Sequence, residues 1–177
     1  MSVRSRTLLA LIAACLLLHP AWGADREVAL SASIPFAEDA AVDVSRLALG
    51  INMRKNIEAQ CHLQTLIPEA IAAQAMRRGI RIRLTTPDES ATGRVLTIVI
   101  EGVLGAAGGA WTGTKSLILR GELRDDGALV GSFVAREQQT ALTQNTCEAL
   151  ATCGRKLAGH IAKWLKSPTL KARLGSA

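Results

Sequence analysis

The chain has 177 residues, of which 49% are hydrophobic and 20% are charged, which is enough apolar material for one globular domain with its own core. This composition excludes a disordered chain, and the lack of a Gly-X-Y period excludes a collagen-like one. The formal charge is +6, but aromatic residues are not interleaved with the basic ones, which argues against nucleic-acid binding.

Residues 1–23 have the pattern of a secretory signal peptide. Arg4 and Arg6 precede an unbroken apolar run of about a dozen residues, which is well short of the roughly 20 needed to span a bilayer as a helix. Small residues at Ala21 and Gly23 predict cleavage after Gly23, which lowers the formal charge from +6 to +4 because two arginines and no acid are removed. We therefore expect a periplasmic protein with no transmembrane span after cleavage.

A second interpretation of the leader is a lipoprotein signal. Residues 12–15 resemble a bacterial lipoprotein box, in which Cys15 becomes the lipidated first residue of an outer-membrane lipoprotein. Three leucines follow this cysteine directly, where a polar tether is usual. Cleavage after Gly23 is therefore the favoured interpretation.

The mature chain is predicted to start with a strand. Apolar residues alternate strictly with small or polar ones over residues 28–36, which is typical of a strand with one buried face. Residues 37–60 are expected to be a solvated connection in which residues 51–60 open a helix. The first clear helix is predicted at residues 63–76, where apolar residues recur every three or four positions and Gly79 follows the end.

Several strands are predicted next. Alternation indicates a strand at residues 80–84, and the nearly continuous apolar run within residues 94–102 indicates a strand covered on both faces. Residues 116–123 and 128–136 are predicted to form a hairpin, because an Asp-Gly pair between them supplies the positive φ angles of its turn. The sheet is therefore expected to have four or five strands in a meander.

The last helix is predicted to begin at a capping box. Asn145 and Glu148 have the required spacing, and the apolar residues that follow fall on one arc of a helix. Residues 167–177 are expected to be a flexible tail. The order strand, helix, strands, helix predicts one α+β domain over residues 24–166, a two-layer sandwich with two helices on one face of an antiparallel sheet.

Three cysteines remain after cleavage, namely Cys61, Cys147 and Cys153. Export makes one disulfide the expectation and leaves one thiol over. Within one continuous helix, Cys147 and Cys153 would lie about 9 Å apart along the axis, beyond the roughly 7 Å limit between the Cα atoms of a disulfide. Either a turn within residues 147–153 allows this bond, or Cys61 pairs with one of the other two.

The spacing of residues in the sequence argues against both a metal site and a nucleotide site. The candidate metal ligands are Cys61, His62, Cys147, Cys153 and His160. They lack the pairs spaced by two to four residues that zinc sites use, so no metal is expected. The glycine-rich residues 102–116 resemble a phosphate-binding loop, but they lack its Gly-Lys-Ser/Thr order and lead into a predicted strand rather than a helix. We expect no cofactor.

Two segments are candidate binding surfaces. Trp111 lies on the glycine-rich connection and is either a plug over the sheet or an exposed anchor, with Lys115 as the nearby charge. The last helix has a basic arc that includes Lys156 and Lys163, and such an arc is either simply solvated or bound to anionic lipid headgroups. The expected partner is therefore an envelope protein or an anionic lipid.

A thiol-dependent enzyme is the alternative hypothesis. No serine lies in a nucleophile elbow, and His62 and His160 are the only histidines after cleavage. Cys61 beside His62 is the best candidate for the nucleophile and base of a hydrolase. Because the side chains of adjacent residues rarely point at one another, a protein without catalytic residues is the favoured interpretation.

Four strings of the sequence carry a resemblance. They are residues 108–116, the hairpin at residues 121–133, residues 147–165 with the two later cysteines, and the Glu-Ala-Gln-Cys-x-Leu string at residues 58–63. Together they resemble an uncharacterised family of small exported proteins of Gram-negative bacteria, over most of residues 58–166. The predicted layout also resembles envelope lipoproteins of the lipopolysaccharide-assembly and transport-auxiliary kind, which implies partner binding without chemistry. We therefore expect an exported, non-enzymatic cell-envelope protein that binds a partner or ligand in the periplasm.

Overall fold

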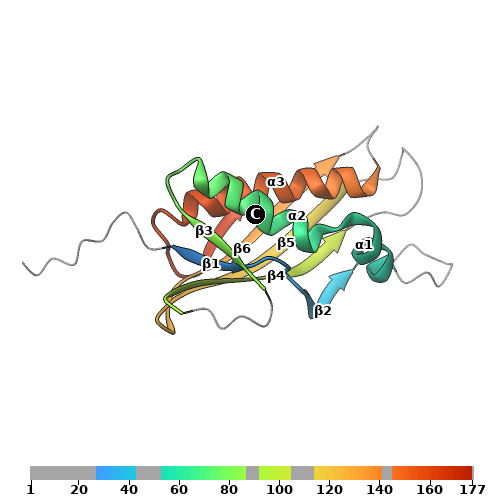
Figure 1. Ribbon diagram of the computed structural model, residues 1–177. Coiled ribbons are helices and arrows are strands. Elements are labelled where there is room, and N and C mark those ends of the chain that lie inside the picture. The colour runs from blue at the N-terminus through green and yellow to red at the C-terminus, as the bar shows by residue number, and fades with distance from the viewer. Residues whose placement is uncertain (1–26, 43–52, 87–91, 105–113, 141–144, 177) are drawn as a thin grey trace, which may run out of the picture.

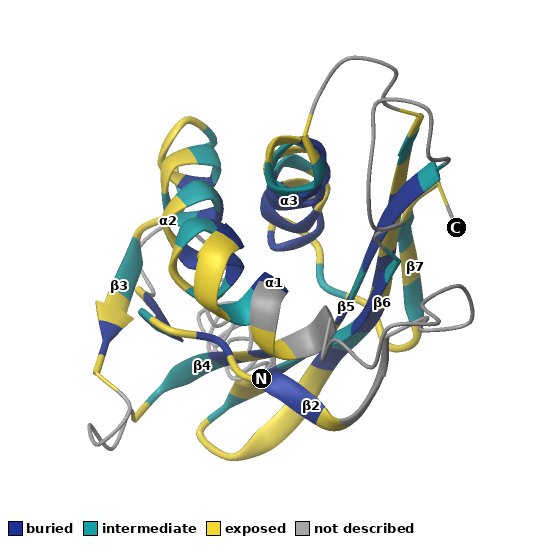
Figure 2. Ribbon diagram, turned by 90° about the vertical axis from the view of Figure 1, so that its right-hand side faces the viewer, coloured by how far each residue is buried: buried dark blue, intermediate teal, exposed yellow. Residues whose placement is uncertain are grey.

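Strands and helices follow one another along the part of the chain that the computed structural model describes, residues 27–42, 53–86, 92–104, 114–140 and 145–176. In chain order they are β1 (Val28–Ser31), β2 (Phe36–Val42), α1 (Met53–Cys61), α2 (Leu63–Met76), β3 (Ile82–Thr85), β4 (Arg94–Leu104), β5 (Thr114–Asp125), β6 (Ala128–Thr140), α3 (Thr146–Trp164) and β7 (Ala172–Gly175). The strands form a seven-stranded sheet, and the helices lie on one face of it (Figures 1 and 2).

The sheet is larger than predicted, and it is mixed rather than antiparallel. Its order is β3-β1-β4-β5-β6-β7, and β2 also pairs with β4. The central strands β4, β5 and β6 are antiparallel, as expected for a meander, whereas β3 with β1, β1 and β2 with β4, and β7 with β6 are parallel pairs. The α+β class is therefore confirmed, and the antiparallel sheet of four or five strands is wrong.

The strand predicted at residues 28–36 ends at Ser31, and a second strand, β2, begins at Phe36 and runs to Val42, within the segment predicted to be a connection. The chain bends between them, where the Ser31 hydroxyl donates a hydrogen bond to the Ser33 carbonyl oxygen at 2.7 Å and Pro35 lacks an N–H for sheet pairing. As a result, β1 pairs with the first part of β4 and β2 pairs with its second part. The two short strands thus share one edge of β4.

Crossover connections explain the parallel pairs. Two helices, α1 and α2, carry the chain from the β2 end back to β3, and α3 carries it from β6 to β7. A helix that packs on the sheet returns the chain to the starting end of the preceding strand, so that the next strand runs parallel to its neighbour. Of these helices, α2 packs against β3, and α3 packs against β5, β6 and β7.

The hydrophobic core lies between the sheet and the helices. Its largest fully buried side chains are Phe133, Leu30, Ile34, Leu63, Ile67, Ile71, Leu96, Ile100, Leu117, Leu119, Leu123 and Leu150. They follow period two on the strands and a three-to-four spacing on the helices, as the sequence pattern predicts. Each fully buried Leu, Ile or Phe contributes about 1.5–3 kcal/mol of burial free energy.

The segment after α3, for which a flexible tail was expected, contains a strand. Residues 172–175 form β7, which pairs with residues 133–136 of β6. Two hydrogen bonds hold the connection between α3 and β7. The Trp164 Nε1 donates to the Thr169 carbonyl oxygen at 3.3 Å, and the Ser132 hydroxyl accepts from the Lys171 amide at 2.9 Å. A four-residue strand has too little pattern of its own to be recognised in the sequence.

Candidate functional site

A disulfide joins Cys61 to Cys147, and the two Cα atoms lie 4.8 Å apart. Cys61 is the last residue of α1 and Cys147 is the second residue of α3, so the bond joins the end of α1 to the start of α3. It confirms one of the pairings that the sequence left open. A Cys147–Cys153 bond is ruled out because both residues lie in one continuous helix, where six residues rise about 9 Å.

The remaining thiol, Cys153, is fully buried on α3. Burial raises the pKa of Cys153 to about 11, and the nearby carboxylate of Glu137 also raises it. The folded protein therefore holds this proton more tightly than the unfolded chain does. The stabilisation from this group is fully present below about pH 9, the ordinary value, and is lost as the pH rises through about 11.

We expect Cys153 to resist alkylation in the native protein, because only the thiolate reacts and this thiol is both neutral and enclosed. Iodoacetamide at pH 8, followed by mass spectrometry, should leave native protein unlabelled and should add one label per chain once urea is present. The native labelling rate should rise only toward pH 11. Rapid labelling of folded protein at pH 8 would show that the thiol is exposed.

The proposed thiol–histidine pair has no free nucleophile in this structure. The Cys61 sulfur is bonded to Cys147. His62 is exposed in the break between α1 and α2, where its φ of 49° is left-handed. Among the residues that the structure describes, no three His, Cys, Asp or Glu side chains lie together as metal ligands.

The candidate residues of the glycine-rich connection are placed only in part. Trp111 lies outside the described residues. Lys115 begins the inward-facing row of β5 that continues with Leu117 and Leu119, and it is only 3% exposed. Burial lowers the pKa of Lys115, because water no longer solvates the charged ammonium. Lys115 is therefore a buried residue of the sheet rather than a surface charge.

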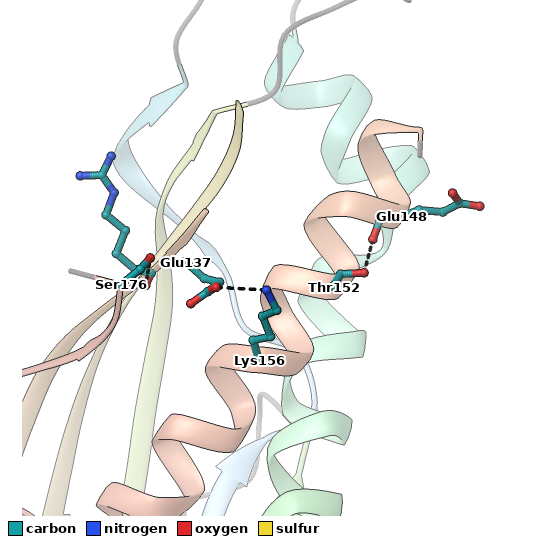
Figure 3. Close-up of polar contacts among 6 residues, drawn as sticks. Glu137, Glu148, Thr152, Lys156 and Ser176 are labelled. Carbon is teal, nitrogen blue, oxygen red and sulfur yellow. Dashed lines mark hydrogen bonds and ion pairs between the residues drawn. The ribbon is translucent and has the colours of Figure 1, made fainter. Parts of the chain in front are cut away.

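The two candidate lysines of the last helix differ in their surroundings. Lys156 Nζ lies 3.4 Å from Glu137 Oε1 on β6, as Figure 3 shows. The Glu137 side chain is 12% exposed, so Lys156 neutralises a largely buried carboxylate. Lys163 is exposed, and its side chain makes no hydrogen bond or ion pair within the described chain. Of the two, Lys156 is already paired with a carboxylate, and Lys163 is the one without such a partner in the described chain.

A groove of about 740 Å³ opens at the bend between β1 and β2. Its polar lining comes from Ser31, Ser33, Gln64, Thr85, Thr86 and Thr97, together with one carboxylate, Glu58. Ile34, Phe36, Leu96 and Ile98 give it an apolar wall. Among the described residues of this lining there is no Arg or Lys, so its chemistry suits a neutral ligand that exchanges hydrogen bonds with hydroxyl and amide groups.

No pattern in the sequence predicts this groove. Its walls come from the ends of β1 and β3 and from the edge of β4. These segments line one groove because β1 and β2 pair with different parts of β4. The break between β1 and β2 is visible in the sequence only as two serines and a proline.

In the described part of the chain, no helix is both long and apolar enough to cross a membrane.

Comparison with known proteins gives structural similarity only. No protein-family model matches the chain, and no curated protein matches it significantly. A PelC dodecamer from Paraburkholderia phytofirmans is 13% identical, with 77% of this chain and 91% of that one covered and a TM-score of 0.44. A variant of that dodecamer is 16% identical, with 77% and 87% covered and a TM-score of 0.46. A crystal structure of an uncharacterized protein is 12% identical, with 80% and 99% covered and a TM-score of 0.44.

Proposed function

We propose that this chain is an exported cell-envelope protein that acts by binding and not by catalysis. The observation that carries the proposal is the disulfide between Cys61 and Cys147, because such bonds form and persist in oxidising compartments such as the periplasm. The leader at residues 1–23 supports the same location. Cleavage after Gly23 is the processing that we propose.

The state of the cysteines favours binding over thiol chemistry. A hydrolase that uses Cys61 needs a free thiolate, and this sulfur is held in the disulfide. The other thiol, Cys153, is buried and has a raised pKa, which suits a packing role on α3.

Fractionation combined with intact-mass measurement tests this proposal. We expect the protein in the periplasmic or outer-membrane fraction of a Gram-negative host, with the mass of residues 24–177 less two hydrogens. After denaturation without reductant, one thiol per chain should react with iodoacetamide, and after reduction three should react. A full-length, fully reduced protein in the cytoplasm would refute the proposal, and a diacylglycerol adduct at Cys15 would replace Gly23 as the processing site.

A further inference from the structure

One end of the molecule gathers the carboxyl ends of both long helices. α2 and α3 run in the same direction (Figure 1), since the disulfide joins Cys61, two residues before α2, to the start of α3, and Gly154 of α3 lies against Ile67 of α2. Because both helices rise about 1.5 Å per residue, Met76 at the end of α2 is about level with Lys163 of α3. We call this the basic end of the molecule.

Strand starts complete the basic end. Val28 is paired with both Ile82 and Arg94, so β1, β3 and β4 begin together. The start of β6 joins them through the hairpin turn, because Asp125 is paired with both Arg94 and Ala128. A side chain at Gly131 would meet the Trp164 ring at 2.6 Å, which places the end of α3 directly over this part of β6.

Most of the exposed large apolar side chains lie at this end. They are Met76 at 76% exposure, Leu170 at 57%, Leu129 at 42% and Val130 at 37%. Within the described chain, only Leu84 and Val134 are comparable side chains elsewhere. Single exposed apolar residues are common on soluble proteins, but here four of them are concentrated at one end of the molecule.

Cations without partners surround these apolar side chains. Within the described residues, no hydrogen bond or ion pair is made by the side chains of Arg77, Arg81, Lys163, Lys166 and Lys171. Two of the acids nearby are already matched, since Glu27 lies 3.5 Å from Arg83 and Asp125 lies 3.8 Å from Arg94. The negative ends of the α2 and α3 dipoles favour cations here, but they do not account for exposed apolar side chains among them.

We propose that the basic end docks on a membrane surface that carries anionic lipid headgroups. This partner rests on the proposed envelope location. Separate apolar side chains enter the headgroup boundary while the surrounding cations meet the phosphates, and this combination is what interfacial binding requires.

Vesicle flotation with the purified, disulfide-bonded mature protein tests the docking. We expect the protein to float with vesicles of phosphatidylcholine containing about 30 mol% phosphatidylglycerol, and to bind pure phosphatidylcholine at least about tenfold more weakly. Raising the salt to about 0.5 M should release it, because the Debye length then shortens to a few ångströms.

Two pairs of matched variants locate the surface. Lys163→Glu with Lys166→Glu should weaken binding at least about tenfold, whereas Arg155→Glu with Arg173→Glu makes the same charge change on exposed residues elsewhere and should weaken it much less. Met76→Ser with Leu170→Ser should weaken binding at constant charge, and Leu84→Ser with Val134→Ser is its control. Thermal melting must show that each variant remains folded.

Failure to float with anionic vesicles at low salt would overturn the docking proposal. So would equal losses in the basic-end variants and their controls, since that outcome indicates attraction by net charge alone. Either result leaves the export proposal intact, because fractionation measures the location of the protein independently of vesicle binding. Conversely, a reduced cytoplasmic protein would refute export whether or not the purified protein binds vesicles.

Discussion

Replacing Cys61 and Cys147 together by serine is expected to lower the free energy of unfolding by about 4 kcal/mol. The disulfide closes a loop with a sequence separation of 86, and loop-closure entropy for that length gives about 4–5 kcal/mol, within the 2–5 kcal/mol commonly lost with a native disulfide. This is a large part of the 5–15 kcal/mol total of an ordinary domain. Urea unfolding followed by circular dichroism measures the loss.

Cys153→Ala is the matched control for the loss of a cysteine side chain. It removes one buried sulfur from α3 but no cross-link, so it should cost only about 1–2 kcal/mol from packing. Reductant should destabilise the wild-type protein about as much as the double serine substitution does, and it should leave the double variant unchanged. A double variant within about 1 kcal/mol of wild type would show that the bond is not a main source of stability.

The first helix should respond most strongly to loss of the bond. α1 has nine residues, which is shorter than an isolated helix needs in water, and among its described side chains only Ile57 and Cys61 are buried. Hydrogen exchange should therefore show faster exchange in α1 than in α2 when the disulfide is removed. Equal acceleration in both helices would indicate that the bond stabilises only the fold as a whole.

Local signals in the sequence predicted the elements that depend on neighbours along the chain. The helix expected at residues 63–76 has the bounds of α2, and the cap at Asn145 is formed, since its Oδ1 accepts from the Glu148 amide at 2.9 Å. The hairpin also forms around its predicted turn, with φ of 48° at Asp126 and 85° at Gly127. In each case the deciding interactions span a few residues.

Long-range pairing was not visible in the same way. β3, β1 and β4 lie side by side as parallel strands, and nothing in period-two alternation distinguishes a parallel neighbour from an antiparallel one. The connection to β7 is held by Trp164 and Ser132, and β7 itself pairs with β6 and packs Ala172 and Leu174 against the core. The enlarged sheet is therefore a consequence of tertiary contacts that a sequence pattern does not contain.

The candidate site residues also divide into those that a local sequence pattern predicts and those that only tertiary packing brings together. In the sequence Lys115 is the charge near Trp111, yet the alternation of Leu117, Leu119 and Leu123 already places residue 115 on the inward face of the strand. The basic end was only half visible, because Lys163 belongs to the predicted basic arc whereas Arg77 and Arg81 come from a distant segment. Only the parallel packing of α2 and α3 brings these charges to one end.

Trp164→Ala is expected to lower the free energy of unfolding by about 3–5 kcal/mol, as for other buried aromatic residues. The Trp164 ring packs edge-on against Phe133 with centroids 4.9 Å apart. Its Nε1 also donates to the Thr169 carbonyl oxygen at 3.3 Å, which holds the connection to β7. The substitution therefore leaves a cavity over Gly131 and frees the last strand. Urea unfolding measures the first effect, and hydrogen exchange across residues 169–176 measures the second.

Trp164→Phe separates the two roles of the indole. A phenyl ring keeps much of the contact with Phe133 but loses the hydrogen bond to Thr169, so the variant should lose about 1–2 kcal/mol, with exchange in residues 169–176 accelerated more than in the core strands. The exposed neighbour Lys163 gives the baseline, since Lys163→Ala should change stability by less than about 0.5 kcal/mol. If Trp164→Ala left β7 as protected as in the wild type, the pairing of β7 with β6 would not depend on this side chain, and the anchoring role of Trp164 would be wrong.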